Sequence, residues 1–290
     1  MPSPAPALVL LAAGLGSRFG GPKQLAPIGP AGDALIDYTA RDALAAGFGK
    51  LVLVTRGEIV DVMEQHVRKR WPADAPVEIV RQDLEAAAAA AARAGRTKPL
   101  GTAHAVLTAA AVLDGPFGVA NADDLYGPAG FRLLADHLRS GRGHTLVAYH
   151  LARTLLGDRP VNRALCRVTD GGRLLGIVEG EVRHDGGRLT WAPLGGSPSE
   201  TVAMTGDELV SVNLWGFTPD VVPVLAAAFA DFAAGDGVLS GAELFLPTVV
   251  GEHLSGGLEV TVLATEDSCL GVTHPDDVPL LRETLTAPAW

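Results

Sequence analysis

The first 124 residues alternate short apolar runs, rich in β-branched residues, with longer segments whose apolar residues recur at helical spacing. The apolar runs cover residues 7–13, 50–56, 77–82 and 116–124, and the helical patterns cover residues 35–47, 59–71 and 102–113. Strands that alternate with helices in this way form parallel sheets, because each crossover helix packs back onto a face of the sheet. The pattern predicts an α/β, Rossmann-like sheet that is mixed, mostly parallel and flanked by helices.

The pattern changes after about residue 150. The segments "RALCRVTDGGRLLGIVE" (163–179) and "VRHDGGRLTWAP" (182–193) contain short strand-like runs joined by Asp-Gly-Gly turns, which are typical of hairpins. They predict an antiparallel insertion in the second half of the chain. Strand and helix patterns return after residue 208, and "GAELFLPTVVGEHL" (241–254) predicts another helix. No change of composition marks a linker, so we predict one domain over residues 1–290 with two halves, 1–150 and 151–290.

Charge and cysteine content exclude several classes of protein. A formal net charge of −10 argues against nucleic-acid binding, which depends on excess Lys and Arg. The two cysteines, Cys166 and Cys269, have neither a disulfide pattern nor metal-site spacing, which favours a reducing, cytoplasmic location. The apolar run at residues 7–13 is too short to span a membrane, so we expect no membrane contact.

A glycine-rich loop, "AAGLGSRFGGPKQL" (12–25), follows the first predicted strand. Such a loop brings backbone N–H groups close to an anion, because glycine has no Cβ in the way. The dinucleotide-binding pattern fails, since Phe19 stands where the third glycine is required and the second strand ends in Thr55-Arg56 without an acidic residue. The P-loop pattern fails because Lys23 is followed by Gln24 and not by Ser or Thr. The loop is therefore a phosphate site of another kind.

The longer string "LAAGLGSRFGGPKQL" (11–25) resembles the nucleotidyltransferases that join a sugar 1-phosphate to a nucleoside triphosphate, whose loop reads L-A-x-G-x-G-x-R followed by P-K. The resemblance implies Mg²⁺ as cofactor, release of pyrophosphate, and a homo-oligomer as a possible assembly. It assigns nucleotide binding to residues 1–150 and acceptor binding to residues 151–290. It implies catalytic roles for Arg18 and Lys23. The nucleotide-binding residues that it implies in this loop are Ala12, Ala13, Gly14, Gly16, Ser17, Arg18 and Lys23.

Two further segments resemble the part of this family that reads the base. "IVRQ" ends at Gln82, and "GTAHA" begins with Gly101 and Thr102. The resemblance implies that the Gln82 amide and the backbone of the glycine loop face the base, with UTP or dTTP favoured. His104 lies beside this loop, but we interpret it as a helix residue, because an attacking phosphate is already ionised and needs no general base.

The segment "VANADDLYG" (119–127) resembles the family strand that ends in the metal-binding aspartate. The resemblance places Asp123 on that aspartate, as both a metal ligand and a catalytic residue. Mg²⁺ prefers oxygen ligands and often takes only one or two carboxylates from a protein. Because successive residues of an extended strand point in opposite directions, we expect Asp123 and Asp124 not to share one metal equally.

The acceptor half matches the family more weakly. "LLGIVEG" places Glu179, and "VSVNLWGF" places Asn213, where the family contacts sugar hydroxyls; carboxylate and amide groups suit a polyol because they receive its O–H groups in fixed directions. Many members have a lysine after this glutamate to meet the sugar phosphate, but here the residue is Gly180, and Arg183 and Arg188 are the candidates to replace it. The second metal aspartate of the family is matched by Gly271.

Two alternatives to a sugar-phosphate nucleotidyltransferase stay open. One is an enzyme of the same fold with a non-sugar phosphate acceptor, and the ending "VTHP" (272–275) is closer to the cytidylyltransferases of isoprenoid synthesis. The other is a nucleotide-binding regulatory protein without catalytic activity. Such a protein would not need the aspartate and the lysine that this chain lacks at the two family positions. Retention of Arg18, Lys23 and Asp123 favours an enzyme.

Overall fold

The computed structural model describes residues 5–14, 22–82, 99–238, 240–272 and 274–290. Four parallel strands form one half of its central sheet, in the order β3–β2–β1–β4. They are β1 (Ala7–Leu11), β2 (Lys50–Thr55), β3 (Val77–Arg81) and β4 (Phe117–Asn121). Each lies within a predicted apolar run. Residues 8–11 of β1 are all buried, as is typical of a parallel strand that is covered on both faces.

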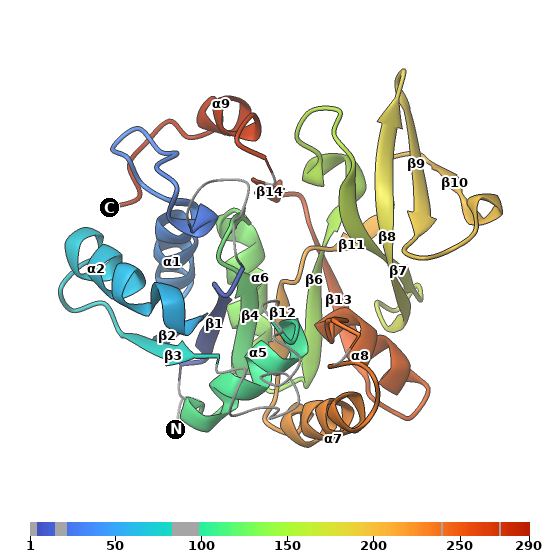
Figure 1. The fold of residues 1–290 in the computed structure, drawn as a ribbon, viewed down its shortest axis with the longest axis horizontal. Coiled ribbons are helices and arrows are strands. Elements are labelled where there is room, and N and C mark those ends of the chain that lie inside the picture. The colour runs from blue at the N-terminus through green and yellow to red at the C-terminus, as the bar shows by residue number, and fades with distance from the viewer. Residues whose placement is uncertain (1–4, 15–21, 83–98, 239, 273) are drawn as a thin grey trace.

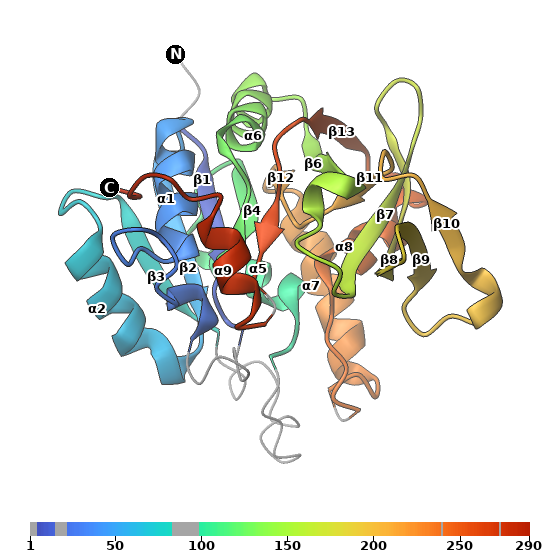
Figure 2. The same cartoon turned by 90° about the horizontal axis from the view of Figure 1, so that it is seen from above.

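Helices cover both faces of this half, and the alternation of side chains along β1 explains how. Leu8 and Leu10 belong to a core that contains residues of α1 (Leu35–Ala45), α2 (Val60–Arg70) and α6 (Pro128–Ser140). Val9 and Leu11 belong to a second core, with α5 (Thr102–Ala109), α7 (Val221–Ala234) and α8 (Leu246–Leu254). Figures 1 and 2 show the two helical layers on opposite sides of the sheet.

Mixed and antiparallel strands continue the same sheet. Next to β4, β12 (Trp215–Phe217) is antiparallel, and β6 (His144–His150) follows, with β13 (Val260–Thr265) parallel to it. Beyond β6 the pairing is antiparallel, through β11 (Leu209–Ser211), β7 (Val161–Val168), β8 (Leu174–Asp185), β9 (Arg188–Pro193) and β10 (Val202–Met204). Gly186 and Gly187 form the tight turn between β8 and β9, with φ of +55° and +85°.

This architecture confirms the predicted fold class. The sheet is mixed and flanked by helices, its first half is parallel, and the predicted antiparallel insertion is present as β7–β10, which Figure 1 shows at the edge far from β3. The sheet is continuous across residue 150, where the two predicted halves meet. Within the described residues, no helix is long and apolar enough to cross a membrane.

The C-terminal segment packs against the N-terminal half. The short strands β5 (Asp124–Leu125) and β14 (Leu270–Gly271) pair with each other, and α9 (Asp277–Arg282) follows. Leu281 and Val272 share a small core with Ile28 and Leu35. The described 3₁₀ segments are Lys23–Leu25, Gly57–Ile59, Ala110–Val112, Leu151–Thr154 and Pro198–Glu200.

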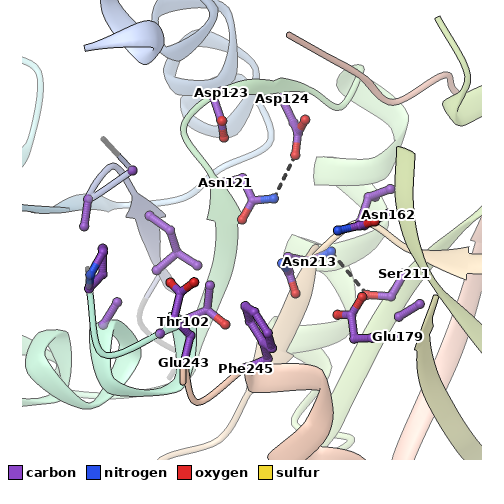
Figure 3. A pocket seen from close by; sticks show the side chains of 18 of the residues that line it. Thr102, Asn121, Asp123, Asp124, Asn162, Glu179, Ser211, Asn213, Glu243 and Phe245 are labelled. Atoms are coloured by element: carbon purple, nitrogen blue, oxygen red, sulfur yellow. Dashed lines mark hydrogen bonds between the residues drawn. The ribbon is translucent and has the colours of Figure 1, made fainter. Parts of the chain in front are cut away.

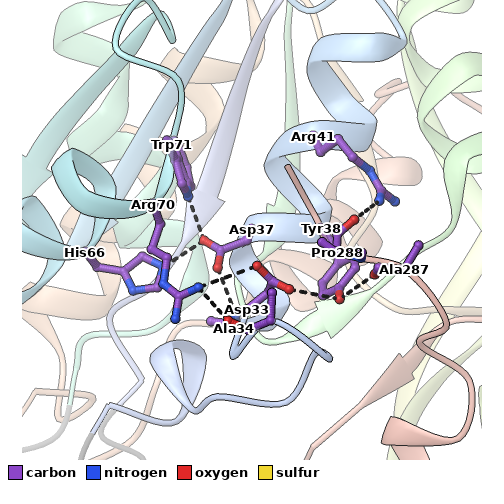
Figure 4. A network of polar contacts seen from close by, with 11 residues as sticks. Asp33, Ala34, Asp37, Tyr38, Arg41, His66, Arg70, Trp71, Ala287 and Pro288 are labelled. Atoms are coloured by element: carbon purple, nitrogen blue, oxygen red, sulfur yellow. Dashed lines mark hydrogen bonds and ion pairs between the residues drawn. The ribbon is translucent and has the colours of Figure 1, made fainter.

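A buried carboxylate joins α1 to α2 (Figure 4). Asp37 is fully buried, and its Oδ1 accepts a hydrogen bond from Trp71 Nε1 at 2.6 Å and lies 2.7 Å from His66 Nε2. Its Oδ2 accepts from the backbone N–H of Ala34 at 2.8 Å, which satisfies a donor at the start of α1. Beside it, the Tyr38 hydroxyl donates to a backbone carbonyl of the C-terminal segment.

Replacing Asp37 by alanine is expected to lower the free energy of unfolding by about 3 kcal/mol, because a buried indole N–H and a helix-terminal amide lose their acceptor. Urea denaturation would measure this change. Asp136→Ala is the matched control, since that carboxylate is 72% exposed and pairs only with Arg139 on its own helix. We expect the control to change stability by less than about 0.5 kcal/mol. Equal losses of unfolding free energy in Asp37→Ala and Asp136→Ala would contradict a stabilising role for the hydrogen bonds of Asp37.

Candidate functional site

A pocket of about 460 Å³ lies at the carboxyl ends of β1, β3 and β4. Ligand sites of open α/β sheets are typically found at this edge. Nine predicted site residues line it: Ala13, Gly14, Lys23, Gln82, Gly101, Thr102, Asp123, Glu179 and Asn213. Ala12 is buried behind the lining, where its carbonyl accepts from Gln24 Nε2 at 2.5 Å. Gly16, Ser17 and Arg18 lie outside the described residues. The roles predicted for all these residues stay predictions.

Lys23 is held on the pocket wall by oxygen atoms of Asp123 and Val272, among other contacts. Its ammonium group pairs with the Asp123 carboxylate and donates to the Val272 carbonyl at 3.2 Å. The Lys23 and Asp123 side chains are 24% and 22% exposed, so the pair is accessible to a ligand but partly shielded from water. The core formed by the C-terminal segment and the N-terminal half fixes the Val272 carbonyl in this position.

The two adjacent aspartates both line the pocket, so the expectation that they point in opposite directions is wrong (Figure 3). The physical reason is that β4 ends at Asn121 and Asp123 lies in a turn, where the alternation of a strand no longer applies. Asn121 Nδ2 donates to Asp124 Oδ2 at 2.7 Å. Burial and then the charge of Asp123 raise the pKa of Asp124, whereas the Asn121 hydrogen bond acts in the opposite direction.

Gly271 leaves room for Asp124. The two residues pair across β14 and β5, and a Cβ at position 271 would overlap the Asp124 carboxylate. The aspartate that the family resemblance led us to look for at position 271 would therefore clash in this chain. At this end of the pocket a second carboxylate is still present, and it comes from Asp124, the residue next to Asp123.

The donors around Asp123 fit the Mg²⁺ ion that the resemblance implies. Two carboxylates and the side chain of Asn121 line the same end of the pocket, and hard cations prefer such oxygen ligands. Among the described residues, no group of three or more His, Cys, Asp or Glu side chains could hold a metal ion. The pocket is thus suited to a cation that takes most of its ligands from phosphate and water.

The amide of Gln82 is fixed by two neighbours. Its Nε2 donates to the Gly101 carbonyl at 3.4 Å and lies 2.9 Å from His104 Nδ1. Burial lowers the pKa of His104 to about 4, so the imidazole is neutral at pH 7 and one of its two ring nitrogens can accept. Because a carbonyl only accepts, the amide nitrogen must face Gly101. The Gln82 Oε1 atom is buried and has no partner within the described residues, so an acceptor is left for a ligand.

Gly101 is required by its contacts as well as by its conformation. Its φ is +103°, and a Cβ there would overlap the backbone of Leu244. The Ala103 N–H donates to the Leu244 carbonyl at 3.0 Å, and Thr102 Oγ1 accepts from the Leu246 N–H at 2.8 Å. The base loop of the sequence prediction is therefore anchored to the chain segment before α8.

Glu179 and Asn213 line the pocket from the second half of the chain (Figure 3). Burial raises the pKa of Glu179, while the charge of Arg163 lowers it. Asn213 has a φ of +64°, the only positive value for a described residue other than glycine. Its Oδ1 accepts from Trp215 Nε1 at 3.2 Å; since an indole nitrogen only donates, the Asn213 amide nitrogen is the group left free to donate to a ligand.

Neither predicted replacement for the lysine lies in the pocket. Arg183 is 68% exposed and pairs with Glu181 at 2.5 Å, and Arg188 is exposed next to the turn between β8 and β9. At position 180 itself, a Cβ would overlap the indole ring of Trp191. The fold thus excludes a side chain at 180.

Sequence reasoning missed several residues that line the pocket: Gln24, Asn121, Asn162, Arg163, Ser211, Glu243 and Phe245. Asn121 could have been found, because it is a polar residue at the end of the strand that precedes Asp123. Glu243 and Phe245 could not, because residues 241–254 were predicted to be helical throughout, whereas α8 begins at Leu246. The preceding segment reaches the pocket through backbone pairing of Leu244 with Leu100 and Ala103.

Comparisons with known proteins show the family and the fold. The sequence model of the family described as "MobA-like NTP transferase domain" matches residues 8–156, just over half of the chain. The inositol-1-phosphate CTP transferase from T. maritima has a TM-score of 0.64 at 14% identity, over 98% of this chain and 99% of that one.

A putative glucose-1-phosphate thymidylyltransferase from Bacillus anthracis, solved in complex with a sucrose, has a TM-score of 0.66 at 11% identity, over 98% of this chain and 96% of that one. At such identities, the likeness to both structures concerns the fold. No curated protein matches the chain.

Proposed function

The chain belongs to the family of MobA-like NTP transferase domains and is a nucleotidyltransferase, and we propose that it transfers a nucleotidyl group from UTP or dTTP to a sugar 1-phosphate. One observation carries this proposal. A single pocket contains the Lys23–Asp123 pair, the Gln82 amide next to Gly101, and the polar side chains of Glu179 and Asn213. Such a pocket has groups suited to a triphosphate, a base and a polyol.

The proposed reaction needs no side-chain nucleophile. An oxygen of the sugar phosphate attacks the α-phosphorus of the NTP and forms the new P–O bond. The bond from the α-phosphorus to the oxygen that bridges to the β-phosphate breaks, and pyrophosphate leaves with that bonding pair. The attacking oxygen is already ionised, so no general base is required, which agrees with a buried, neutral His104. Catalysis then depends on alignment and on neutralisation of charge.

Lys23 supplies positive charge to the triphosphate, and Arg18 is proposed to bind the same group through its planar guanidinium. Asp123, with Asp124 beside it, would hold Mg²⁺. When bound, that ion would neutralise phosphate charge and help to orient the triphosphate. The Glu179 carboxylate would accept sugar O–H groups, and the Asn213 amide nitrogen would donate to a sugar oxygen.

The free acceptor on Gln82 is proposed to receive an N–H group of the base. Gln82→Leu keeps a similar shape and removes that acceptor, so we expect KM for the NTP to rise about 10-fold while KM for the acceptor changes little. Initial-rate kinetics with one substrate saturating would measure both constants. Gln65→Leu, at an exposed position of α2, is the control and should leave both unchanged. An unaltered KM for the NTP in Gln82→Leu would remove this residue from the base site.

The function is tested by a matrix of five NTPs against a panel of phosphorylated acceptors, with pyrophosphate release as the readout. CTP and inositol 1-phosphate belong in the matrix because a protein of similar fold is an inositol-1-phosphate CTP transferase. We expect the largest rate with UTP or dTTP and a sugar 1-phosphate. We also propose a cytoplasmic location, which the free thiols of Cys166 and Cys269 support.

A further inference from the structure

Arg163 is the second basic residue, besides Lys23, in the described lining of the pocket. It lies on β7 and also lines an adjoining cavity of about 230 Å³, which shares Asp124 with the main pocket. Arg163 lines the main pocket together with Asp124 and Glu179, and its charge opposes the rise in pKa that burial causes at each carboxyl. Arg163 is therefore positioned between the aspartate end and the proposed acceptor end of the site.

The partners of the Arg163 guanidinium among the described residues are all neutral. Its Nε donates to Thr154 Oγ1 at 2.9 Å, its Nη2 to the Thr154 carbonyl at 2.6 Å, and its Nη1 to the Asn162 carbonyl at 2.8 Å. Among the described residues, no carboxylate lies within 4.0 Å of it, whereas Lys23 pairs directly with Asp123. These three bonds orient the group and leave two of its five N–H donors, one on each Nη, for another acceptor.

The backbone of Arg163 is fixed as firmly as its side chain. The residue pairs with Gly180 across β7 and β8, and the indole Nε1 of Trp191 donates to the Arg163 carbonyl at 3.0 Å. The Trp191 ring fills the space that a side chain at Gly180 would need. The packing of Trp191 thus has two results. It excludes a side chain at position 180, and it fixes the backbone of Arg163 directly across the strand pair.

From this geometry we infer that Arg163 binds the phosphate group of the acceptor. A partly buried cation without a directly paired acid is stabilised by an anionic ligand, and a guanidinium with one free N–H on each Nη matches two phosphate oxygens. The proposed acceptor carries such a phosphate, and Glu179, the proposed partner of its hydroxyls, lines the same pocket as Arg163. The identity of the acceptor in this inference rests on the proposed function. The presence of a phosphate site at Arg163 does not.

The test compares Arg163→Met with two other variants. Arg167→Met removes an arginine from the same strand that is exposed and does not line the pocket. Thr154→Val removes one of the hydrogen bonds that orient the guanidinium of Arg163 and keeps its charge. In initial-rate kinetics, we expect Arg163→Met to raise KM for the acceptor by about 10- to 100-fold, with KM for the NTP changed less than about twofold. Arg167→Met should stay within about threefold of the wild type, and Thr154→Val should raise KM for the acceptor less than Arg163→Met does, because the charge remains and two of the three orienting bonds are kept.

A binding measurement separates this inference from the proposed function. Calorimetry with inorganic phosphate, on protein saturated with UTP, should show binding to the wild type that is weakened at least about 10-fold in Arg163→Met and not in Arg167→Met. Equal phosphate binding by the wild type and Arg163→Met would overturn the inference, as would no binding to either. A wild type that binds phosphate but releases no pyrophosphate in the matrix contradicts the proposed function alone.

Discussion

Replacing Lys23 by methionine is expected to reduce kcat/KM for pyrophosphate release by about two to three orders of magnitude. The ammonium group lies at the aspartate end of the pocket, in an ion pair with Asp123 that is only partly exposed to water. Positive charge at this place is worth more to a reacting triphosphate than it would be in bulk water, because water screens it less. Methionine keeps an unbranched side chain and removes the charge.

Stability measurements distinguish this effect from unfolding. An ion pair with this exposure contributes about 1 kcal/mol or less, so the melting temperature of Lys23→Met should stay close to that of the wild type. Lys50→Met is the matched control, since Lys50 pairs with Glu78 at the opposite end of β2. We expect the control to keep nearly full activity. If Lys23→Met were nearly as active as Lys50→Met, the triphosphate would have to bind elsewhere.

Replacing Asp123 by asparagine is expected to reduce kcat by about two to three orders of magnitude and to shift the Mg²⁺ dependence to higher concentrations. Asparagine has nearly the same shape, but it lacks the charge that attracts the cation and pairs with Lys23. Titration of Mg²⁺ at saturating substrates would measure the shift. Asp124 remains in the variant and keeps its Asn121 hydrogen bond, so some metal-supported activity should persist at high Mg²⁺.

Asp170→Asn is the control for this prediction, because Asp170 is exposed in the turn between β7 and β8. It removes the same charge from the chain at a residue that does not line the pocket. We expect its Mg²⁺ dependence to match that of the wild type. An Asp123→Asn enzyme with the wild-type rate and Mg²⁺ dependence would exclude this carboxylate as a ligand.

Local patterns predicted the elements well, because burial on both faces requires nearly continuous apolar residues. The runs that predicted β1, β2, β3 and β4 begin at most one residue before the observed strands and end one to three residues after them. The family resemblance assigns Gln82 and Asp123 to one site, and the structure places both at the edge of the sheet where these strands end.

Contacts between distant segments could not be predicted in this way. The alternation rule failed at Asp124 because a turn follows Asn121, and the pairing of Gly271 with Asp124 depends on a strand almost 150 residues later. Likewise, Arg163 reaches the pocket only through the antiparallel pairing of β7 with β8 and β11, whereas Arg183 faces solvent on β8. The sequence shows that Asp124, Arg163 and Arg183 are charged, but it does not show which of them lie beside the pocket.

The measurement that tests the central claim most directly is the fate of the α-phosphate. UTP or dTTP labelled at this position would be incubated with a sugar 1-phosphate and Mg²⁺, and the nucleotide sugar and pyrophosphate would be quantified together. We predict one labelled nucleotide sugar for each pyrophosphate released, with no release when the acceptor is omitted. Pyrophosphate release that does not depend on any acceptor, or labelled NMP as the sole product, would contradict transfer between two ligands in this pocket.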